Sequence, residues 1–265
     1  MTEVVHSDLV DEVLTLTLDS PANRNALGEA LVAQLLDGLR AAERDPGIRA
    51  VMLTHTGGTF CAGADLSEAL ARGADVAEAS AMGTSAMIDL MRVILEMPKP
   101  VIAKVDGHVR AGGFGLLGAA DIALAGPRCT FALTEARLGL APSVISLVLL
   151  PKMTARSSGR YFLTGETFDP STAVRNGLVT EAFASADDLD AGVASVLAGI
   201  RRASPQGLAA SKMLATAAVL SGFRGLAGQR ADESAALFAS EEAREGMTAF
   251  LSKRAPRWDL SVSAD

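Results

Sequence analysis

Apolar positions along this chain follow two spacings, which predict strands that alternate with helices. Residues 13–18 alternate leucine with valine or threonine, the period of two that is typical of a strand. Leucine and methionine recur at helical spacing in 31–39 and 87–94. Three largely apolar runs indicate buried strands, at 50–53, 101–105 and 121–125. Continuous apolar strands between helices favour an α/β core with parallel strands.

The last part of the chain has a different pattern. Ser204 followed by Pro205 is a good N-cap and first-turn pair for a helix. From there to Leu251, alanine, leucine, methionine and charged residues dominate, and no strand-like run occurs. We therefore expect an α/β core over residues 1–200 and a helical region over 201–265.

Composition narrows the class of function. The chain has 265 residues, of which 49% are hydrophobic, and a formal net charge of −7 without a dominant basic cluster, so nucleic acid is not expected as a partner. Its polar first residues do not form a signal peptide, and no apolar run is long enough for a membrane span. A cytoplasmic protein without a membrane partner is predicted, and an anionic substrate would need local positive charge.

The cysteines and histidines do not form a metal-binding or disulfide pattern. Cys61 lies in a glycine-containing turn and Cys129 in a strand-like run, without C-x-x-C spacing, so we expect two unpaired thiols. His6, His55 and His108 lack the spacing of metal ligands. No metal site is predicted.

Two segments of small residues, 59–66 and 110–115, are the best candidates for chemistry. Each lies between a strand-like run and a helix-like run. Small side chains let a ligand approach the backbone, and the N–H groups at the start of a helix are unpaired. Two such N–H groups directed at one point would stabilise an oxyanion, so the pattern predicts chemistry at a carbonyl group.

The second segment also contains a G-x-G-x-x-G pattern at 113–118, with Glu135 further along the chain. A dinucleotide-binding fingerprint would follow its strand directly and open a full crossover helix. Here residues 106–111 come between the predicted strand and the pattern, and little room is left for a helix before the next strand. Nucleotide binding is therefore not expected.

Five motifs occur in order along nearly the whole chain. They are A-N-R-N-A-L at 22–27, F-C-A-G-A-D-L at 60–66, K-P-V-I-A-K-V-D-G at 99–107, L-T-G-E at 163–166 and K-R-A-P at 253–256. Together they resemble the crotonase superfamily, also called the enoyl-CoA hydratase/isomerase family. The resemblance implies a spiral ββα core with a C-terminal helical trimerisation region, assembled as homotrimers or hexamers. It also implies an acyl-CoA thioester as the ligand, with coenzyme A as part of the substrate and no separate cofactor.

The resemblance also implies roles for particular residues. The oxyanion hole falls on the backbone N–H groups of Ala64 and Gly112, and the catalytic acid/base is Glu135. The expected acyl-CoA contacts are Arg24, Ala62, Gly63, Asp65, Leu66, Gly113, Gly115, Phe250 and Lys253. The last two match positions that approach the CoA of a neighbouring subunit.

One carboxylate that hydratases of this family usually carry is absent, because Gly115 occupies its position. Hydration of a C2=C3 bond needs a base for water and a proton for C2, which two carboxylates divide between them, whereas isomerisation needs one base. We expect a hydratase-type lyase that uses Glu135 alone. The alternatives are a 3-enoyl-CoA to 2-enoyl-CoA isomerase and a non-catalytic acyl-CoA-binding protein. A glutamate at 115 should restore the second carboxylate if the pocket has room.

Arg137 follows Glu135 by two residues. If this segment is extended, the two side chains share a face, and an ion pair would lower the pKa of Glu135 and weaken it as an acid. The sequence leaves open whether the two side chains meet.

Overall fold

Among the described residues, the larger of two sheets contains six strands, in the order β1-β2-β3-β5-β7-β9. The structure is a computed structural model that describes residues 2–65 and 76–261. Strands β1 (Val5–Val10) and β2 (Val13–Leu18) form an antiparallel hairpin, and the later neighbours pair in parallel. These later strands are β3 (Ala50–His55), β5 (Val101–Val105), β7 (Ile122–Ala125) and β9 (Glu181–Ala182).

The smaller sheet consists of three short parallel strands: β4 (Thr59–Cys61), β6 (His108–Arg110) and β8 (Thr130–Ala132). Each follows a strand of the larger sheet, since β3 precedes β4, β5 precedes β6 and β7 precedes β8. Parallel strands share one direction, so the segments that follow β4, β6 and β8 all leave the small sheet at the same edge.

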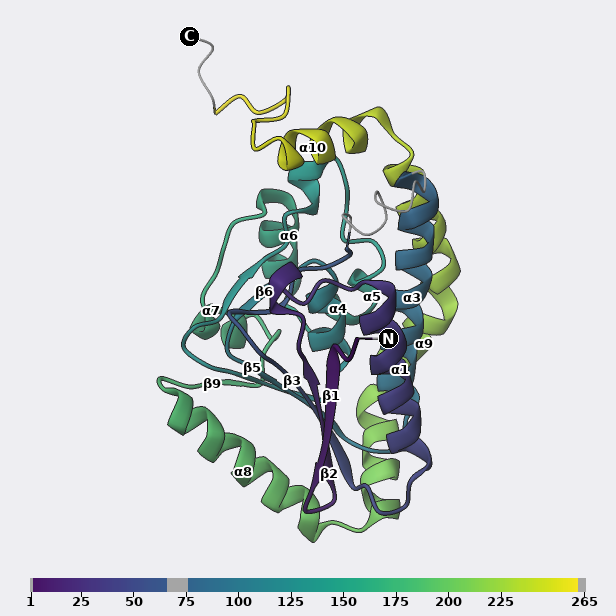
Figure 1. The fold of residues 1–265 in the computed structure, drawn as a ribbon, viewed down its shortest axis with the longest axis vertical. Coiled ribbons are helices and arrows are strands. Elements are labelled where there is room, and N and C mark those ends of the chain that lie inside the picture. Colours follow the sequence, from purple (N-terminus) through teal and green to yellow (C-terminus); the bar gives the residue numbers. More distant parts are fainter. Residues whose placement is uncertain (1, 66–75, 262–265) are drawn as a thin grey trace.

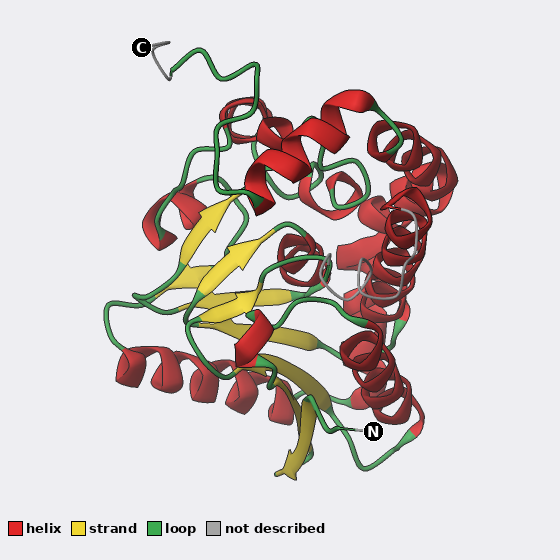
Figure 2. Cartoon of the chain, turned by 45° about the horizontal axis from the view of Figure 1, so that its top comes forward, coloured by secondary structure: helices red, strands yellow, loops and turns green. Residues whose placement is uncertain are grey.

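Helices cover both faces of the larger sheet (Figures 1 and 2). On one face lies α8 (Ala186–Arg202), whose Leu189 and Val193 pack against Ile102 and Leu124 of the sheet. On the other face α1 (Glu29–Arg44) contacts the sheet, α3 (Val76–Glu96) packs on α1, and α9 (Pro205–Phe238) packs on α3.

The remaining helical elements are short. They are η1 (Pro21–Asn23), α4 (Gly112–Ala119), η2 (Glu135–Leu138), α5 (Ser146–Leu149), α6 (Ala155–Thr164), α7 (Pro170–Arg175) and α10 (Glu241–Leu251). Helix α10 lies at the end of the molecule opposite the β1–β2 hairpin (Figure 1). Within the described residues, no helix is long and apolar enough to cross a membrane.

Helix α9 is attached to the core by a buried ion pair. The ammonium group of Lys212 lies 2.8 Å from a carboxylate oxygen of Asp121 and donates to the carbonyls of Ile94 and Lys99 at 2.7 and 2.9 Å. Its charge is therefore fully partnered, as burial requires. Phe223 of α9 belongs to the same apolar core as the sheet residues.

The predicted long elements are present, but short strands were missed. Strands β4, β6 and β8 have three residues each, which is too few to show a period of two. The two cysteine placements need correction, since Cys61 is the last residue of β4 and Cys129 precedes β8 in a loop. Both are buried free thiols, and desolvation raises the pKa of each to about 12.

Candidate active site

The small sheet brings the three predicted catalytic positions to one edge. Strand β4 leads to Ala64, β6 leads to Gly112, and β8 leads to Glu135. Because β4, β6 and β8 are parallel neighbours, three segments that are far apart in sequence leave the sheet together. Ligands of α/β proteins bind at this kind of edge, outside the carboxyl ends of parallel strands.

The two small-residue turns lie directly against each other. Gly63 has a φ of +97°, and a Cβ at that position would lie 2.6 Å from the Cβ of Ala111 and 3.4 Å from the backbone nitrogen of Gly112. Both the positive φ and the close approach require glycine. The turn after β4 is therefore in contact with the start of α4.

The backbone N–H groups of Ala64 and Gly112 are free to bind a ligand. Gly112 is the first residue of α4, where an N–H has no partner within the helix. Beside Ala64, the Leu27 N–H donates to the carbonyl of Gly63 at 2.7 Å, which holds the turn in place. Within residues 2–65 and 76–261, neither of the two N–H groups has an acceptor. Two free donors on touching turns are what an oxyanion hole requires.

The backbone immediately before Gly112 is strained. Ala111 is the N-cap of α4 and has a φ of 42° and a ψ of −117°, a region that glycine favours and alanine rarely adopts. Such residues cost of order 1–3 kcal/mol and cluster at ligand sites, where the surrounding structure holds them. The strain at Ala111 supports the interpretation of this turn as a binding turn.

Glu135 is the first residue of η2, and its carboxyl group is desolvated. Its Oε2 atom is buried without a hydrogen-bond partner among the described residues. Desolvation raises the pKa of Glu135 to about 7. A carboxyl group that titrates near neutral pH can both accept and donate a proton there.

Arg137 does not pair with Glu135. Its Nε and Nη2 atoms donate to the carbonyl of Thr164, the last residue of α6, at 3.0 and 2.8 Å. The segment is helical, not extended, and residues two apart on a helix do not face each other. The ion pair that would have lowered the pKa of Glu135 is therefore absent from the described contacts.

Glu135 should make the fold less stable as pH rises. Because its folded-state pKa is above the ordinary value of 4.5, the native state holds this proton more tightly, and stability is lost between pH 4.5 and about 7. We expect Glu135→Gln to remove up to roughly 3 kcal/mol of this loss, which makes the variant more stable than the parent at pH 8 but not at pH 4. Urea unfolding at both pH values measures the difference.

The matched control for that experiment is Glu181→Gln, which changes an exposed glutamate in the edge strand β9. The difference in free energy of unfolding between this variant and the parent should be the same at pH 4 and pH 8. If Glu135→Gln raised the free energy of unfolding equally at both pH values, the desolvation of the Glu135 carboxyl group would be contradicted.

Gly115 does not face an empty space. A Cβ at this position would lie 2.5 Å from the Sδ atom of Met87, 3.1 Å from Ile145 Cγ2 and 3.3 Å from Met91 Sδ. The room that a glutamate at 115 would need is therefore filled by apolar side chains. Gly115→Glu therefore requires the flexible thioether end of Met87 to move, and the first carbon of the new side chain would have apolar neighbours.

The other predicted acyl-CoA contacts near the two turns have structural partners of their own or lie beside the turn residues. Asp65 accepts a hydrogen bond from Asn23 Nδ2 at 2.8 Å, so it connects the first turn to η1, and Ala62 lies just before Gly63. A Cβ at Gly113 would lie 2.9 Å from the carbonyl oxygen of Cys61, so glycine there permits close packing of α4 on β4. Leu66 lies outside the described residues.

Phe250 lies on α10 and Lys253 lies just after it, and α10 contacts η2 of the same chain. A Cβ at Gly246 of α10 would lie 2.4 Å from the carbonyl oxygen of Leu138. Phe250 is 61% exposed, and Lys253 is also exposed. Arg24 is exposed at the end of η1 with a left-handed φ of 61°. Thus all three predicted CoA contacts are accessible to a ligand.

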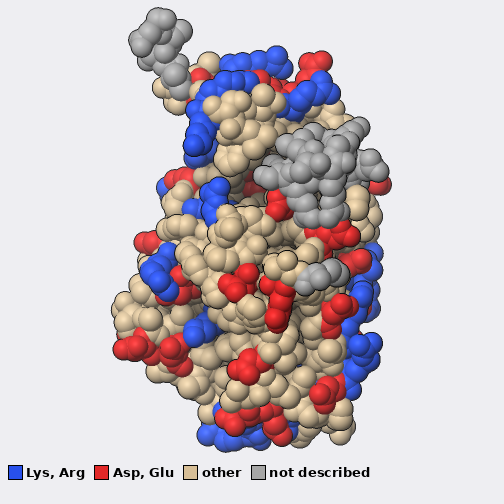
Figure 3. Space-filling view, viewed as in Figure 1, with Lys and Arg blue, Asp and Glu red and all other residues tan. Residues whose placement is uncertain are grey.

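Charges of both signs lie together at the α10 end of the molecule. The exposed basic residues of α10 and the segment after it are Arg244, Lys253, Arg254 and Arg257, and the acidic residues Glu241, Glu242, Glu245 and Asp259 lie among them. Arg254 is paired with Glu245 at 2.7 Å. Figure 3 shows blue and red atoms together at the top of the molecule, where Figure 1 places α10. An anionic ligand here would therefore meet individual basic side chains and not a uniformly positive patch.

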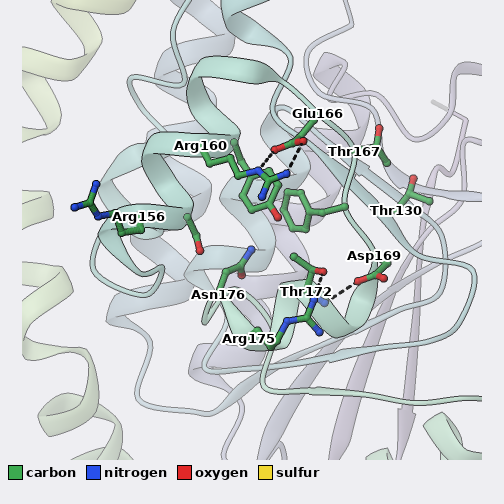
Figure 4. A pocket seen from close by; sticks show the side chains of 12 residues that line it. Thr130, Arg156, Arg160, Glu166, Thr167, Asp169, Thr172, Arg175 and Asn176 are labelled. Carbon is green, nitrogen blue, oxygen red and sulfur yellow. Dashed lines mark hydrogen bonds and ion pairs between the residues drawn. The ribbon is translucent and has the colours of Figure 1, made fainter.

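A hollow of about 760 Å³ opens between α6 and α7 (Figure 4). None of the predicted site residues that the structure describes lines it. Several of its charged groups have local partners, since Arg160 pairs with Glu166, and Arg175 donates to the hydroxyls of Ser171 and Thr172. We therefore do not assign the predicted chemistry to this hollow.

The sequence missed two residues that shape the candidate site. The side chain of Leu27 would come within 2.7 Å of a Cβ at Gly112, and its place in the A-N-R-N-A-L motif was a signal that could have identified it. Met87 borders both Gly112 and Gly115. Its only sequence signal was an apolar position at helical spacing, which any core residue shares.

The chain is similar to known proteins over nearly its whole length. The family model for enoyl-CoA hydratase/isomerase matches residues 9–260. A 2,3-dehydroadipyl-CoA hydratase of Escherichia coli is 34% identical over 92% of this chain and 94% of its own length. A 1,2-epoxyphenylacetyl-CoA isomerase of the same organism is 30% identical over 97% of this chain and 99% of its own length.

Solved structures agree with this similarity. The crystal structure of an enoyl-CoA hydratase from Mycobacterium avium is 54% identical and has a TM-score of 0.89, covering 97% of this chain and all 100% of its own. The crystal structure of a carnitinyl-CoA hydratase from Mycobacterium avium is 30% identical and has a TM-score of 0.85. The match covers 98% of this chain and 99% of that structure's chain. The predicted α/β class with a spiral ββα core is confirmed.

Proposed function

Because the chain belongs to the enoyl-CoA hydratase/isomerase family, we propose that it is a hydratase-type lyase, which adds water reversibly across C2=C3 of an enoyl-CoA thioester. The thioester oxygen binds to the N–H groups of Ala64 and Gly112, and Glu135 transfers the protons. The observation that carries this proposal is the desolvated carboxyl group of Glu135, whose pKa is raised to about 7.

The lone carboxylate performs two tasks in each turnover. Ionised Glu135 takes a proton from water as the water oxygen bonds to C3, and the electron pair of the double bond moves towards the thioester oxygen. The resulting enolate is stabilised by the two N–H groups. Neutral Glu135 then returns its proton to C2, and the carbonyl re-forms. A pKa near neutral pH suits a group that must act as base and then as acid.

Isomerisation is the second candidate, and the surroundings of Gly115 favour it. The side chains nearest to this position, Met87, Met91 and Ile145, are all apolar. They offer no polar group to hold a water molecule on that side of the substrate. In this reaction Glu135 removes a proton from C2 of a 3-enoyl-CoA and returns it to C4, while the same two N–H groups hold the enolate.

Two kinds of substrate separate the reactions. With crotonyl-CoA or 3-methylglutaconyl-CoA, hydration lowers the absorbance of the conjugated thioester and incorporates oxygen from isotopically labelled water. With a 3-enoyl-CoA, isomerisation raises that absorbance. A rise in absorbance with the 3-enoyl substrate, without a fall in absorbance with the 2-enoyl substrates, would favour the isomerase. Binding without turnover of either kind would contradict both and leave an acyl-CoA-binding protein.

Helices α9 and α10 are proposed to mediate assembly into homotrimers or hexamers. Met213 and Leu214 of α9 are 64% and 78% exposed, and Phe250 of α10 is 61% exposed. Met213 and Leu214 lie near the start of α9 and Phe250 lies on α10 beyond its other end, so these are separate exposed apolar positions that contacts with neighbouring subunits would cover. Light scattering should give a mass three or six times that of the 27.3 kDa chain. Replacing Met213 and Leu214 by lysine should lower that mass, and a monomeric parent protein would refute the proposal.

A further inference from the structure

Met87 lies between the proposed oxyanion donor and the position of the absent carboxylate. Its Sδ atom is 2.5 Å from where a Cβ at Gly115 would be, and its Cε atom is 3.5 Å from a Cβ at Gly112. The residue itself is 6% exposed. One side chain of α3 therefore borders two positions of α4 that are one turn apart.

This placement puts Met87 beside the first carbons of a bound acyl group. A helix rises about 1.5 Å per residue, so Gly115, three residues after Gly112 on nearly the same face of α4, lies about 4.5 Å further along the helix. In a thioester whose oxygen is held at Gly112, C2 and C3 are one and two bonds from the carbonyl carbon. An acyl group that runs along α4 from Gly112 towards Gly115 would meet the thioether of Met87 at these carbons, with Met91 and Ile145 beside it.

We propose that Met87 determines which substituents the site accepts at C3, and that it selects apolar ones. This inference rests on the proposed binding of an acyl-CoA thioester by Ala64 and Gly112. A thioether is flexible and polarisable, so it can yield to a methyl or longer alkyl group. A charged group in the same place would lose its water without gaining a polar partner from Met87, Met91 or Ile145, which is unfavourable.

Saturated thioesters test the selection without any turnover. Butanoyl-CoA, 3-methylbutanoyl-CoA and 3,3-dimethylbutanoyl-CoA differ only in the number of methyl groups on C3. Met87→Ala enlarges the space at this position, so its preference for the methylated ligands, measured as a ratio of Kd values by calorimetry, should rise about fourfold for each methyl group that becomes buried. Met87→Leu keeps the apolar volume and should change the ratio less than about twofold.

Met153→Ala is the matched control, because it truncates another buried methionine, between α5 and α6. Its ratio of Kd values should equal that of the parent. If Met87→Ala does not fold, Met87→Val replaces it, with a smaller increase expected. An unchanged ratio in a folded variant that binds CoA, or the same increase in Met153→Ala, would overturn the inference.

The binding measurements also separate this inference from the proposed function. A shifted ratio together with no turnover of any enoyl-CoA would refute the lyase and isomerase proposals while the role of Met87 stands. Turnover with an unchanged ratio would refute the role of Met87 alone. Failure of the parent protein to bind any of the three thioesters would refute both.

Discussion

Replacing Glu135 by glutamine should lower kcat about 10²–10⁴-fold, the contribution typical of a general acid or base. Glutamine keeps the size of the side chain and cannot accept the proton of water or return one to C2. The Kd of a saturated acyl-CoA should change little, because the proposed contacts to the thioester oxygen are made by the backbone. Steady-state kinetics on whichever enoyl-CoA the parent hydrates or isomerises, together with calorimetric binding, measures both effects.

The dependence of kcat/KM on pH is a second test of the role of Glu135. Since the reaction begins with the ionised carboxylate, kcat/KM of the parent should rise with pH and level off above about 7. The residual activity of Glu135→Gln should lack this step, and Glu181→Gln, at an exposed site, should behave as the parent. Full activity in Glu135→Gln would show that another group supplies the base and would refute both proposed reactions.

Replacing Gly112 by proline should lower kcat about 10²–10³-fold, the loss typical when one oxyanion-hole donor is removed. Proline lacks the N–H but is well tolerated at the first residue of a helix, which is the place of Gly112 in α4. The variant deletes the proposed donor with little demand on the helix itself, but proline also restricts the residue before it, and the φ of 42° and ψ of −117° of Ala111 lie outside the extended range that such a residue prefers. Thermal unfolding should verify that the fold is retained before kinetics are compared.

Gly112→Ala is the control that isolates the donor. Both variants add a Cβ, which would meet Leu27 Cδ1 at 2.7 Å unless that flexible side chain moves, but only alanine keeps the N–H. The alanine variant should therefore retain most of the parent activity. Equal losses in the two variants would mean that crowding by the Cβ, not the missing N–H, causes the effect, and the N–H of Gly112 would no longer be a candidate donor.

The sequence by itself determined the long elements and the family, and it singled out the residues proposed for the candidate site. The alternating pattern at 13–18 coincides with β2 and the apolar run at 101–105 with β5, since both kinds of pattern are local properties of the sequence. The glycine at 63 was a sign that the backbone approaches something closely, and the structure shows a positive φ and contact with Ala111 there. Ordered motifs identified the family.

Tertiary structure alone decided how those segments meet. The small sheet that brings Ala64, Gly112 and Glu135 to one edge consists of three-residue strands, which are stabilised by their neighbours and have no pattern of their own. The raised pKa of Glu135 and the turn of Arg137 towards Thr164 depend on burial and on the helical shape of η2. Both the raised pKa and the contact of Arg137 with Thr164 arise only when segments distant in sequence pack against one another.

The surroundings of Gly115 show most clearly what the sequence leaves undetermined and the tertiary structure decides. From the sequence, a missing carboxylate suggested a place that a glutamate could refill. In the structure, Met87 of α3 occupies that place, because a core packs closely and a position without a side chain is filled by its neighbours. Which neighbour does so depends on how α3 lies against α4, and residue spacing along the chain does not encode that contact.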